Sequence, residues 1–146
     1  MVKAVTEKYE EMVLEVETAA NTWTRICGLK DVTVNRSLEL DTDEIPDCDD
    51  ESAPFEKVSE ARSITVAVQA SGVWAQQSNK TLMDWFYSGA TKNVRLGNLK
   101  AAVGASEYEK GPAFLKNLNN SRNKGKAVTA DIDLEFSGIP ERIAKA

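Results

Sequence analysis

Residues 127–137 alternate almost without exception between apolar and polar side chains, and this period of two constrains the fold more than any other feature. Successive side chains of a β-strand point to opposite faces, so the pattern predicts a strand with one apolar face and one acidic face. Residues 62–74 alternate in the same way and are rich in β-branched side chains, which suit a pleated sheet. We therefore expect a mainly β protein.

Further strands are predicted where the alternation is shorter or less regular, at residues 12–17, 23–29, 32–41, 93–99 and 113–119. The last of these is expected to form a hairpin with 127–137, with its tip at 119–126. The apolar positions of the alternating stretches form the expected core: Val32, Val34, Leu38, Leu40, Ile64, Val66, Val68, Ala70, Val128, Ala130, Ile132, Leu134 and Phe136.

One segment has helical spacing. Leu82, Trp85 and Phe86 stand at positions i, i+3 and i+4 and predict a helix over 79–88 with one apolar face. Ser78 is the expected N-cap, and Gly89 is the expected glycine stop. Aromatic side chains that share the apolar stripe of a helix belong to a packed core, so we do not assign them to a ligand site.

Between these elements we expect irregular structure. Residues 42–60 are predicted to be a long acidic loop because Pro46 and Pro54 interrupt strand pairing, and residues 101–111 a second loop. Residues 1–11 are expected to be an N-terminal arm and 139–146 a C-terminal tail. The whole chain, 1–146, is the length of one domain. About seven strands and one flanking helix predict a β-sandwich or a partly open barrel.

Charge is unevenly distributed along the chain. The total is −5, but residues 1–60 carry −10 and residues 61–146 carry +5. Seven acids and no base fall in 41–51, and four bases and no acid fall in 116–126. Two solvated loops would account for this. Alternatively, one patch meets the other on a neighbouring copy, a heterologous contact that builds rings or filaments. The candidate residues for that contact are Asp47, Asp49, Asp50, Glu51, Arg122, Lys124 and Lys126.

Several kinds of chemistry are excluded by composition and motif. Histidine is absent, so His-based catalytic triads and His-ligated metal sites cannot form. The glycine-rich phosphate-binding motifs are also missing. Counted from Asp41, the sixth position of an EF-hand loop is Pro46 and the twelfth is Ser52, so that motif fails. We expect no enzymatic activity and no cofactor or metal, although an irregular calcium site or a sugar-binding β-sandwich stays open as an alternative.

Two further expectations concern location and redox state. Cys27 and Cys48 are too few for a disulfide framework and are expected to be reduced, partly buried thiols. The N-terminus shows no secretory signal, and no stretch approaches the ~20 apolar residues of a membrane-spanning helix. With a pI near 4.9, the chain also lacks the basic footprint of a DNA-reading protein.

The order of these elements resembles the major tail tube proteins of long-tailed phages and of phage-like gene transfer agents. The resemblance spans roughly residues 12–138 and rests on the order of elements and on local sequences: ICGLK, VTVNRSLELDTD with the acidic segment, SITVAVQASGVW, SNKTLMDWFYSG, NVRLGNL and DIDLEFSG. It implies a sandwich or barrel with a flanking helix. It also implies hexameric rings that stack into a tube, with four strands per subunit in an inner barrel, and inter-ring contacts from the long loop and N-terminal arm. The strong acidity of 41–51 departs from the family.

On this resemblance the chain is a structural subunit of a tail tube that assembles with itself and encloses a lumen for DNA. The implied partners are the tape-measure, tail terminator and baseplate or distal tail proteins, with the protein made in the bacterial host cytoplasm and located in the tail of a virion or phage-like particle. A secretion-system tube protein of similar fold is the closest alternative. Small or acidic residues facing outward suit a lumen wall, and the candidates are Thr33, Asn35, Ser37, Glu39, Thr65, Gln69, Asp131, Asp133 and Glu135.

Overall fold

The computed structural model describes residues 2–4, 6–98 and 101–145. Met1, Val5, Leu99 and Ala146, which belong to the predicted arm, the 93–99 strand and the tail, lie outside the described residues. The elements are a short 3₁₀ helix η1 (Tyr9–Glu11), β1 (Met12–Ala19), β2 (Thr22–Arg25), β3 (Leu29–Ile45), β4 (Glu56–Val73), α1 (Gln76–Ser88), β5 (Lys92–Asn98), β6 (Ser106–Ser121), β7 (Thr129–Phe136) and β8 (Glu141–Ala144).

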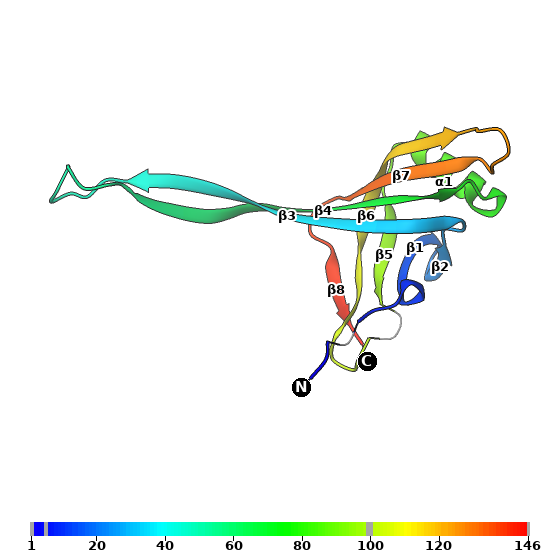
Figure 1. The fold of residues 1–146 in the computed structure, drawn as a ribbon, viewed down its shortest axis with the longest axis horizontal. Helices are drawn as coiled ribbons and strands as arrows, with labels where there is room; N and C mark the ends of the chain where they lie inside the picture. Colours follow the sequence, from blue (N-terminus) through cyan, green and yellow to red (C-terminus); the bar gives the residue numbers. More distant parts are fainter. Residues whose placement is uncertain (1, 5, 99–100, 146) are drawn as a thin grey trace.

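These eight strands form one antiparallel sheet in the order β2-β1-β5-β6-β7-β4-β3, with β8 added beside β6 (Figure 1). β6 is shared between two layers, because residues 108–113 pair with β5 and residues 113–121 pair with β7. We call β3, β4, β7 and the second half of β6 the first layer, and β1, β2, β5, β8 and the first half of β6 the second layer. The mainly β fold with one helix, predicted from the sequence, is confirmed.

The core lies between the two layers and under α1. Val68, Ile132 and Leu134 of the first layer and Val16 and Val94 of the second are at most 1% exposed. Trp85 of α1 is equally buried and donates a hydrogen bond from Nε1 to the Ala90 carbonyl at 3.1 Å. The alternating stretches 62–74 and 127–137 therefore bury the predicted face over most of their length.

Phe86, predicted to pack in the core with Leu82 and Trp85, is instead 37% exposed on α1. Three predicted core residues of the strands are also wrong. Leu38 and Leu40 are 53% and 55% exposed, and Ile64 is 43% exposed. Their positions in the alternating pattern are those of residues on a buried strand face. They do lie on the same face as Val34 and Val68. However, β3 and β4 continue past the end of the second layer, so nothing in the described part of the chain covers them (Figure 1).

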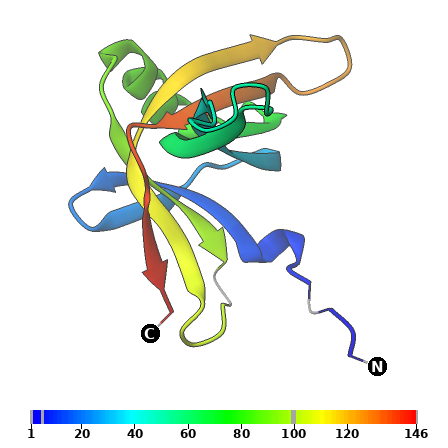
Figure 2. The same ribbon diagram turned by 90° about the vertical axis from the view of Figure 1, so that its left-hand side faces the viewer.

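The predicted loop at 42–60 is also wrong in its extent, because residues 42–45 and 56–60 are strand and only 46–55 form the connection. β3 runs to Ile45 and β4 starts at Glu56, with regular pairs such as Thr42 with Ser59. Pro46 and Pro54 both lie in the connection between the strands. They therefore mark the ends of the paired segments and do not break the pairing within them. Residues 37–64 thus form a long hairpin arm that projects from the body of the molecule (Figures 1 and 2).

The C-terminal half contains further strand where loops were predicted. Residues 106–111, expected in a loop, begin β6, and the expected tail contains β8, which pairs with β6. Pro112 fits within β6 because its fixed φ suits extended backbone and its carbonyl still accepts a hydrogen bond from Ser137 N at 2.8 Å. The hairpin tip is shorter than predicted, since pairing of β6 with β7 continues to Ser121 and Thr129.

Three local predictions need correction. The expected 23–29 strand is two pieces, β2 and the start of β3, separated by a turn in which Gly28 has φ +87°. α1 begins at Gln76 rather than after Ser78, whose buried hydroxyl accepts a hydrogen bond from Cys27 N at 2.8 Å. Cys27 and Cys48 are exposed rather than partly buried. The predicted stop at Gly89 is confirmed, with φ +66°.

Candidate assembly surfaces

The first layer has one face against the core and one face in solvent. On the solvent face, strand register places Thr33, Gln69, Asp133 and Asn117 in one row across β3, β4, β7 and β6. Adjacent rows continue this surface, which we call the polar face. Strand parity puts on it all nine residues predicted to line a lumen: Thr33, Asn35, Ser37, Glu39, Thr65, Gln69, Asp131, Asp133 and Glu135. Sequence alternation therefore grouped them correctly, and their role in a lumen stays a prediction.

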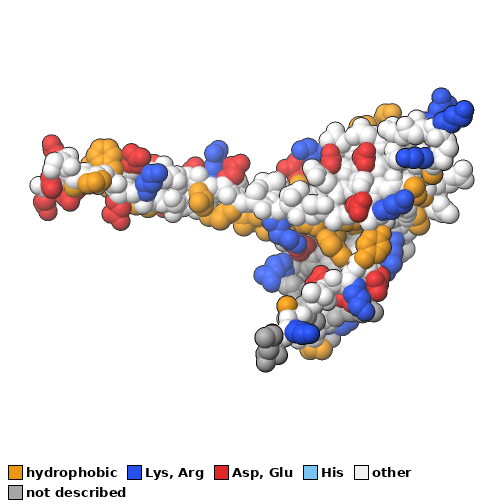
Figure 3. Space-filling view, viewed as in Figure 1, with side chains coloured by type: hydrophobic (Ala, Val, Ile, Leu, Met, Phe, Trp, Pro, Cys, Tyr) orange, Lys and Arg blue, Asp and Glu red, His pale blue; other side chains and the backbone are white. Residues whose placement is uncertain are grey.

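The polar face is acidic but partly neutralised. Glu135 forms an ion pair with Lys116 at 3.3 Å, and Asp133 accepts a hydrogen bond from Asn117 Nδ2 at 2.9 Å. A shallow hollow of about 360 Å³ lies on the same face and is lined in part by Asp31, Asp131 and Asp133. In the view of Figure 3, carboxylates are scattered over a largely uncharged surface of the first layer. A surface with a net negative charge repels phosphate groups.

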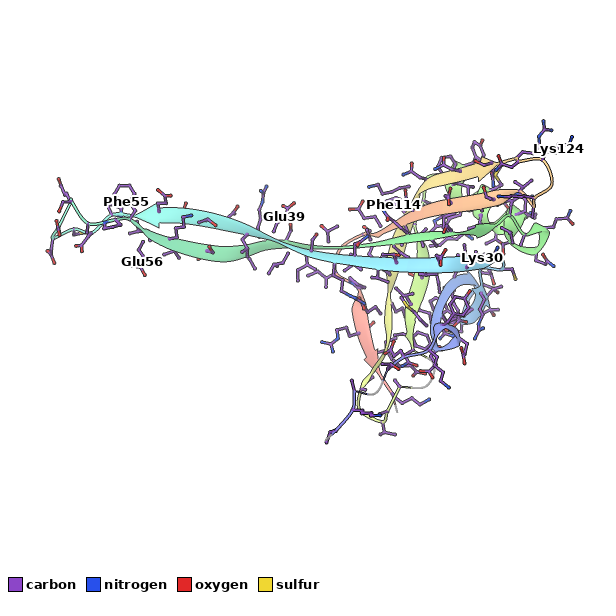
Figure 4. The ribbon with its side chains drawn as sticks, in the orientation of Figure 1. Lys30, Glu39, Phe55, Glu56, Phe114 and Lys124 are labelled. Carbon is purple, nitrogen blue, oxygen red and sulfur yellow. The ribbon has the colours of Figure 1, made fainter. Side chains whose placement is uncertain are left out.

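Phe114 interrupts the polar face and was not identified from the sequence. It lies opposite Glu135 at the edge strand β6 and is 42% exposed (Figure 4). The irregular pairing of β6 between Leu115 and Asn117 explains why alternation along this strand did not reveal which face Phe114 occupies.

Both outer strands of the first layer have an edge without a partner in the described part of the chain. β3 pairs with β4 alone, and residues 114–121 of β6 pair only with β7. Each edge carries backbone N–H and C=O groups that are able to pair with another strand. The two edges lie at opposite ends of the layer order β6-β7-β4-β3.

The arm is strongly acidic. Residues 37–64 contain ten acids and two bases, a net charge of −8, which leaves +3 on the rest of the chain. At its tip, Asp47 Oδ1 accepts a hydrogen bond from Asp49 N at 2.8 Å. The hydroxyl and N–H of Ser52 both donate to Asp50 Oδ1, which lowers the pKa of that carboxyl. The tip is therefore an anionic turn with internal side-chain hydrogen bonds.

The predicted basic partners lie at the other end of the molecule. Arg122, Lys124 and Lys126 occupy the β6–β7 connection, which we call the basic loop. Figure 4 shows Lys124 at the end of the body that is farthest from Phe55 at the arm tip. The structure does not bring the two charged sets together within one chain, so any contact between them requires a second copy.

The arm also carries an apolar stripe near its base. Leu38 pairs with Ile64, and Leu40 pairs with Ala61, on the face that continues the core (Figure 3). Arg36 lies between this stripe and the core and forms an ion pair with Glu109 of β6, which raises the pKa of Arg36. Exposed apolar stripes of this kind mark contact surfaces.

On the outer face of the second layer, Arg95 lies between two aromatic rings. Its guanidinium is 4.7 Å from the Trp23 ring centroid and 4.6 Å from that of Tyr108, and its Nε is 3.4 Å from Glu15. Burial and the nearby Glu15 carboxylate raise the pKa of Tyr108. Sequence analysis did not detect this cluster, because the four residues are brought together only by strand pairing. It cross-links β1, β2, β5 and β6.

Sites of other kinds were sought in the same residues. Across 2–4, 6–98 and 101–145, no group of three or more Cys, Asp and Glu is placed to hold a metal ion. None of the described helices has the length and apolar character needed to cross a membrane.

Comparison with known proteins gives a consistent result. A family model described as phage tail tube protein matches residues 6–142. A search of curated proteins found no match.

Three solved structures share the fold. The tail of an empty gene transfer agent particle, computed with helical refinement and C6 symmetry, has a TM-score of 0.76 and 11% identity, covering 95% of this chain and 100% of that chain. The virion of a native gene transfer agent has a TM-score of 0.74 and 10% identity, covering 95% and 100%. The SPP1 tail tube has a TM-score of 0.66 and 11% identity, covering 94% and 80%.

Proposed function

Because the chain belongs to the phage tail tube protein family, and is thus a structural subunit of a tail, we propose that copies of it pair edge to edge into hexameric rings that stack around a channel. The observation that carries this proposal is the pair of unpartnered strand edges of the first layer. Such edges invite pairing with another chain, and a ring of copies satisfies every one of them.

Strand direction is compatible with ring closure. β3, β4, β7 and β6 alternate in direction, since each neighbouring pair is antiparallel. An even number of alternating strands leaves β3 and β6 running in opposite directions. When copies are related by rotation about one axis, β3 of one copy and β6 of the next are therefore antiparallel, the more stable way to extend a ladder. Four strands from each copy then form one continuous barrel.

The polar face is the proposed wall of the channel. Apart from Phe114 and the ion-paired Lys116 on β6, its side chains are small, polar or acidic. Asp131, Asp133 and Glu135 lie along the central strand β7. Anionic walls repel the DNA backbone, so a duplex passes without adhering and without sequence recognition. The tape-measure protein is proposed to occupy the same channel before DNA passes.

The arm is proposed to connect successive rings. At about 3.3 Å per residue, the nine residues 37–45 extend roughly 30 Å beyond the body, enough to reach a neighbouring ring. Stacking in one direction places the acidic arm of one ring against the end of the next ring that carries the basic loop. The apolar stripe of Leu38, Leu40 and Ile64 is then covered by the adjacent copy.

Other parts of this proposal concern location. We propose that the protein is made in the bacterial host cytoplasm and that the ends of the tube contact the tail terminator and the baseplate or distal tail proteins. At each end of the tube, these partners would bind the ring surface that elsewhere contacts the next ring.

Negative-stain electron microscopy of the purified chain tests the central proposal. Rings or tubes with a central hole are expected, and two-dimensional class averages should show six-fold symmetry. A protein that stays monomeric at high concentration, under conditions in which it is folded by circular dichroism, would contradict edge-to-edge assembly. Class averages with another symmetry would contradict the hexamer alone.

A further inference from the structure

An apolar groove of about 690 Å³ opens beside the start of β3, between that strand and the N-terminal segment. The hydroxyl of Tyr9 donates to the Leu29 carbonyl at 3.1 Å and fixes one wall. Charged residues of both signs stand around the groove, among them Lys8, Arg25 and Asp31. The apolar lining is formed by Met12, Val13, Leu14, Ile26, Leu29 and Val32. An apolar centre with a polar rim is the anatomy of a protein interface, and the volume is in the range of ~300–1,000 Å³ typical of binding clefts.

Helix α1 presents an aromatic pair on its solvent side. Phe86 is 37% exposed and Tyr87 is 76% exposed, and their rings form an edge-to-face pair with centroids 5.4 Å apart. Met83 precedes them by one turn and is half-buried. Tyrosine and phenylalanine are large and rigid, and they act as interface anchors when a neighbouring surface offers a pocket.

The groove and the aromatic pair lie behind the first layer at opposite edges. α1 packs against β6, whereas the groove borders β3. Figure 2 shows α1 at the upper left, beside β6, and the N-terminal 3₁₀ helix at the lower right. If β6 of one copy adjoins β3 of another, this placement brings the helix of the first copy toward the groove of the second.

We propose that Phe86 and Tyr87 of each copy insert into the groove of the adjacent copy within a ring. This inference rests on the proposed function, because only edge-to-edge pairing brings the two surfaces together. The occupant is a second copy of this chain. The contact adds a second layer of packing behind the strand seam, and the rim cations Lys8 and Arg25 suit the faces of aromatic rings.

Two exposed thiols provide a direct test. Cys27 lines the groove and Cys48 lies at the arm tip. In a Cys48→Ser parent, Tyr87→Cys places one thiol on the helix opposite the native Cys27 of the neighbouring copy. The matched control is Ser88→Cys, an exposed position turned by roughly 100° around the helix. Assembled tubes are treated with a short bis-maleimide cross-linker, denatured and resolved by size.

We expect Tyr87→Cys to give a ladder of covalent multimers ending at the full ring, at least five-fold stronger than that of Ser88→Cys. If both variants form tubes and the ladder of Tyr87→Cys does not exceed that of the control, the inference is overturned and the proposed function stands. If the Cys48→Ser parent forms no rings or tubes, the proposed function fails and the inference fails with it.

A second variant gives an answer that does not depend on the cross-linker. Tyr87→Glu keeps an exposed side chain and should leave the melting temperature of the monomer unchanged. It should raise the protein concentration needed for assembly at least ten-fold, because a carboxylate would enter an apolar groove. If this variant forms tubes of normal diameter at the same protein concentration as the parent, the inference is overturned.

Discussion

Proline substitutions along β3 test whether its outer edge is the seam between copies. Val34 and Asn35 are neighbours in a regular part of the ladder, opposite Val68 and Ala67 of β4. Residues of an antiparallel strand alternate between those whose N–H points toward the partner strand and those whose N–H points away. One of these two N–H groups therefore faces β4, and the other faces the proposed neighbouring copy.

The two positions should respond differently. Proline at the inward position removes one ladder hydrogen bond of about 1 kcal/mol and crowds β4, so the folded monomer loses stability. Proline at the outward position leaves the monomer ladder intact and removes one bond from every seam. A loss of about 1 kcal/mol is roughly a five-fold weakening of each seam, and the losses compound because each copy participates in two seams.

The assay compares thermal unfolding of the monomer with the concentration at which tubes sediment. Val34→Ala and Asn35→Ala measure the loss of each side chain without the loss of an N–H. We expect one proline variant to impair assembly at least five-fold with unchanged melting temperature, and the other to lower the melting temperature. If neither variant separates assembly from stability in this way, the edge of β3 is not the seam.

Three other changes probe the remaining surfaces. Replacing all three bases of the basic loop with glutamate should leave a folded monomer but prevent ring stacking, as seen by electron microscopy; unimpaired tubes would argue against pairing of the loop with the arm. Replacing the three acids of β7 on the polar face with lysine should permit assembly yet hinder DNA transfer, and normal transfer in a particle assay would count against the channel assignment. Trp85→Ala should cost about 3–5 kcal/mol of unfolding free energy in urea, whereas Tyr87→Ala should change it by less than about 0.5 kcal/mol.

The sequence predicted the features that depend on a local pattern. The alternation of 127–137 identified both the buried face of β7 and its acidic face, and that of 62–74 identified the buried Val66, Val68 and Ala70 of β4. Because register follows from this alternation, nine residues from three strands were assigned to one surface before any pairing was known. Gly89 was identifiable as a helix stop because the residue that ends a helix often needs a left-handed φ, which glycine adopts without strain.

The features that the sequence failed to predict depend on the three-dimensional arrangement of the strands, beginning with the point at which the second layer ends. Leu38 and Leu40 have the pattern of core residues, but alternation does not report how far a strand extends beyond the element that covers it. Pro46 and Pro54 suggested a loop over 42–60, but both lie in the connection between the strands and leave the pairing on either side intact. The contacts of Arg95 and the groove beside β3 arise from residues far apart in the chain, which no local spacing reveals.

The sharing of β6 between both layers has a mechanical consequence. Residues 106–113 hold β5 and β8, and the same continuous backbone goes on to pair with β7. A load applied to the inner surface of an assembled cylinder would therefore pass through covalent bonds into the outer shell, rather than across a slip plane of side chains. Such a wall would deform as a single unit, which would help the proposed channel to stay round during the proposed passage of DNA.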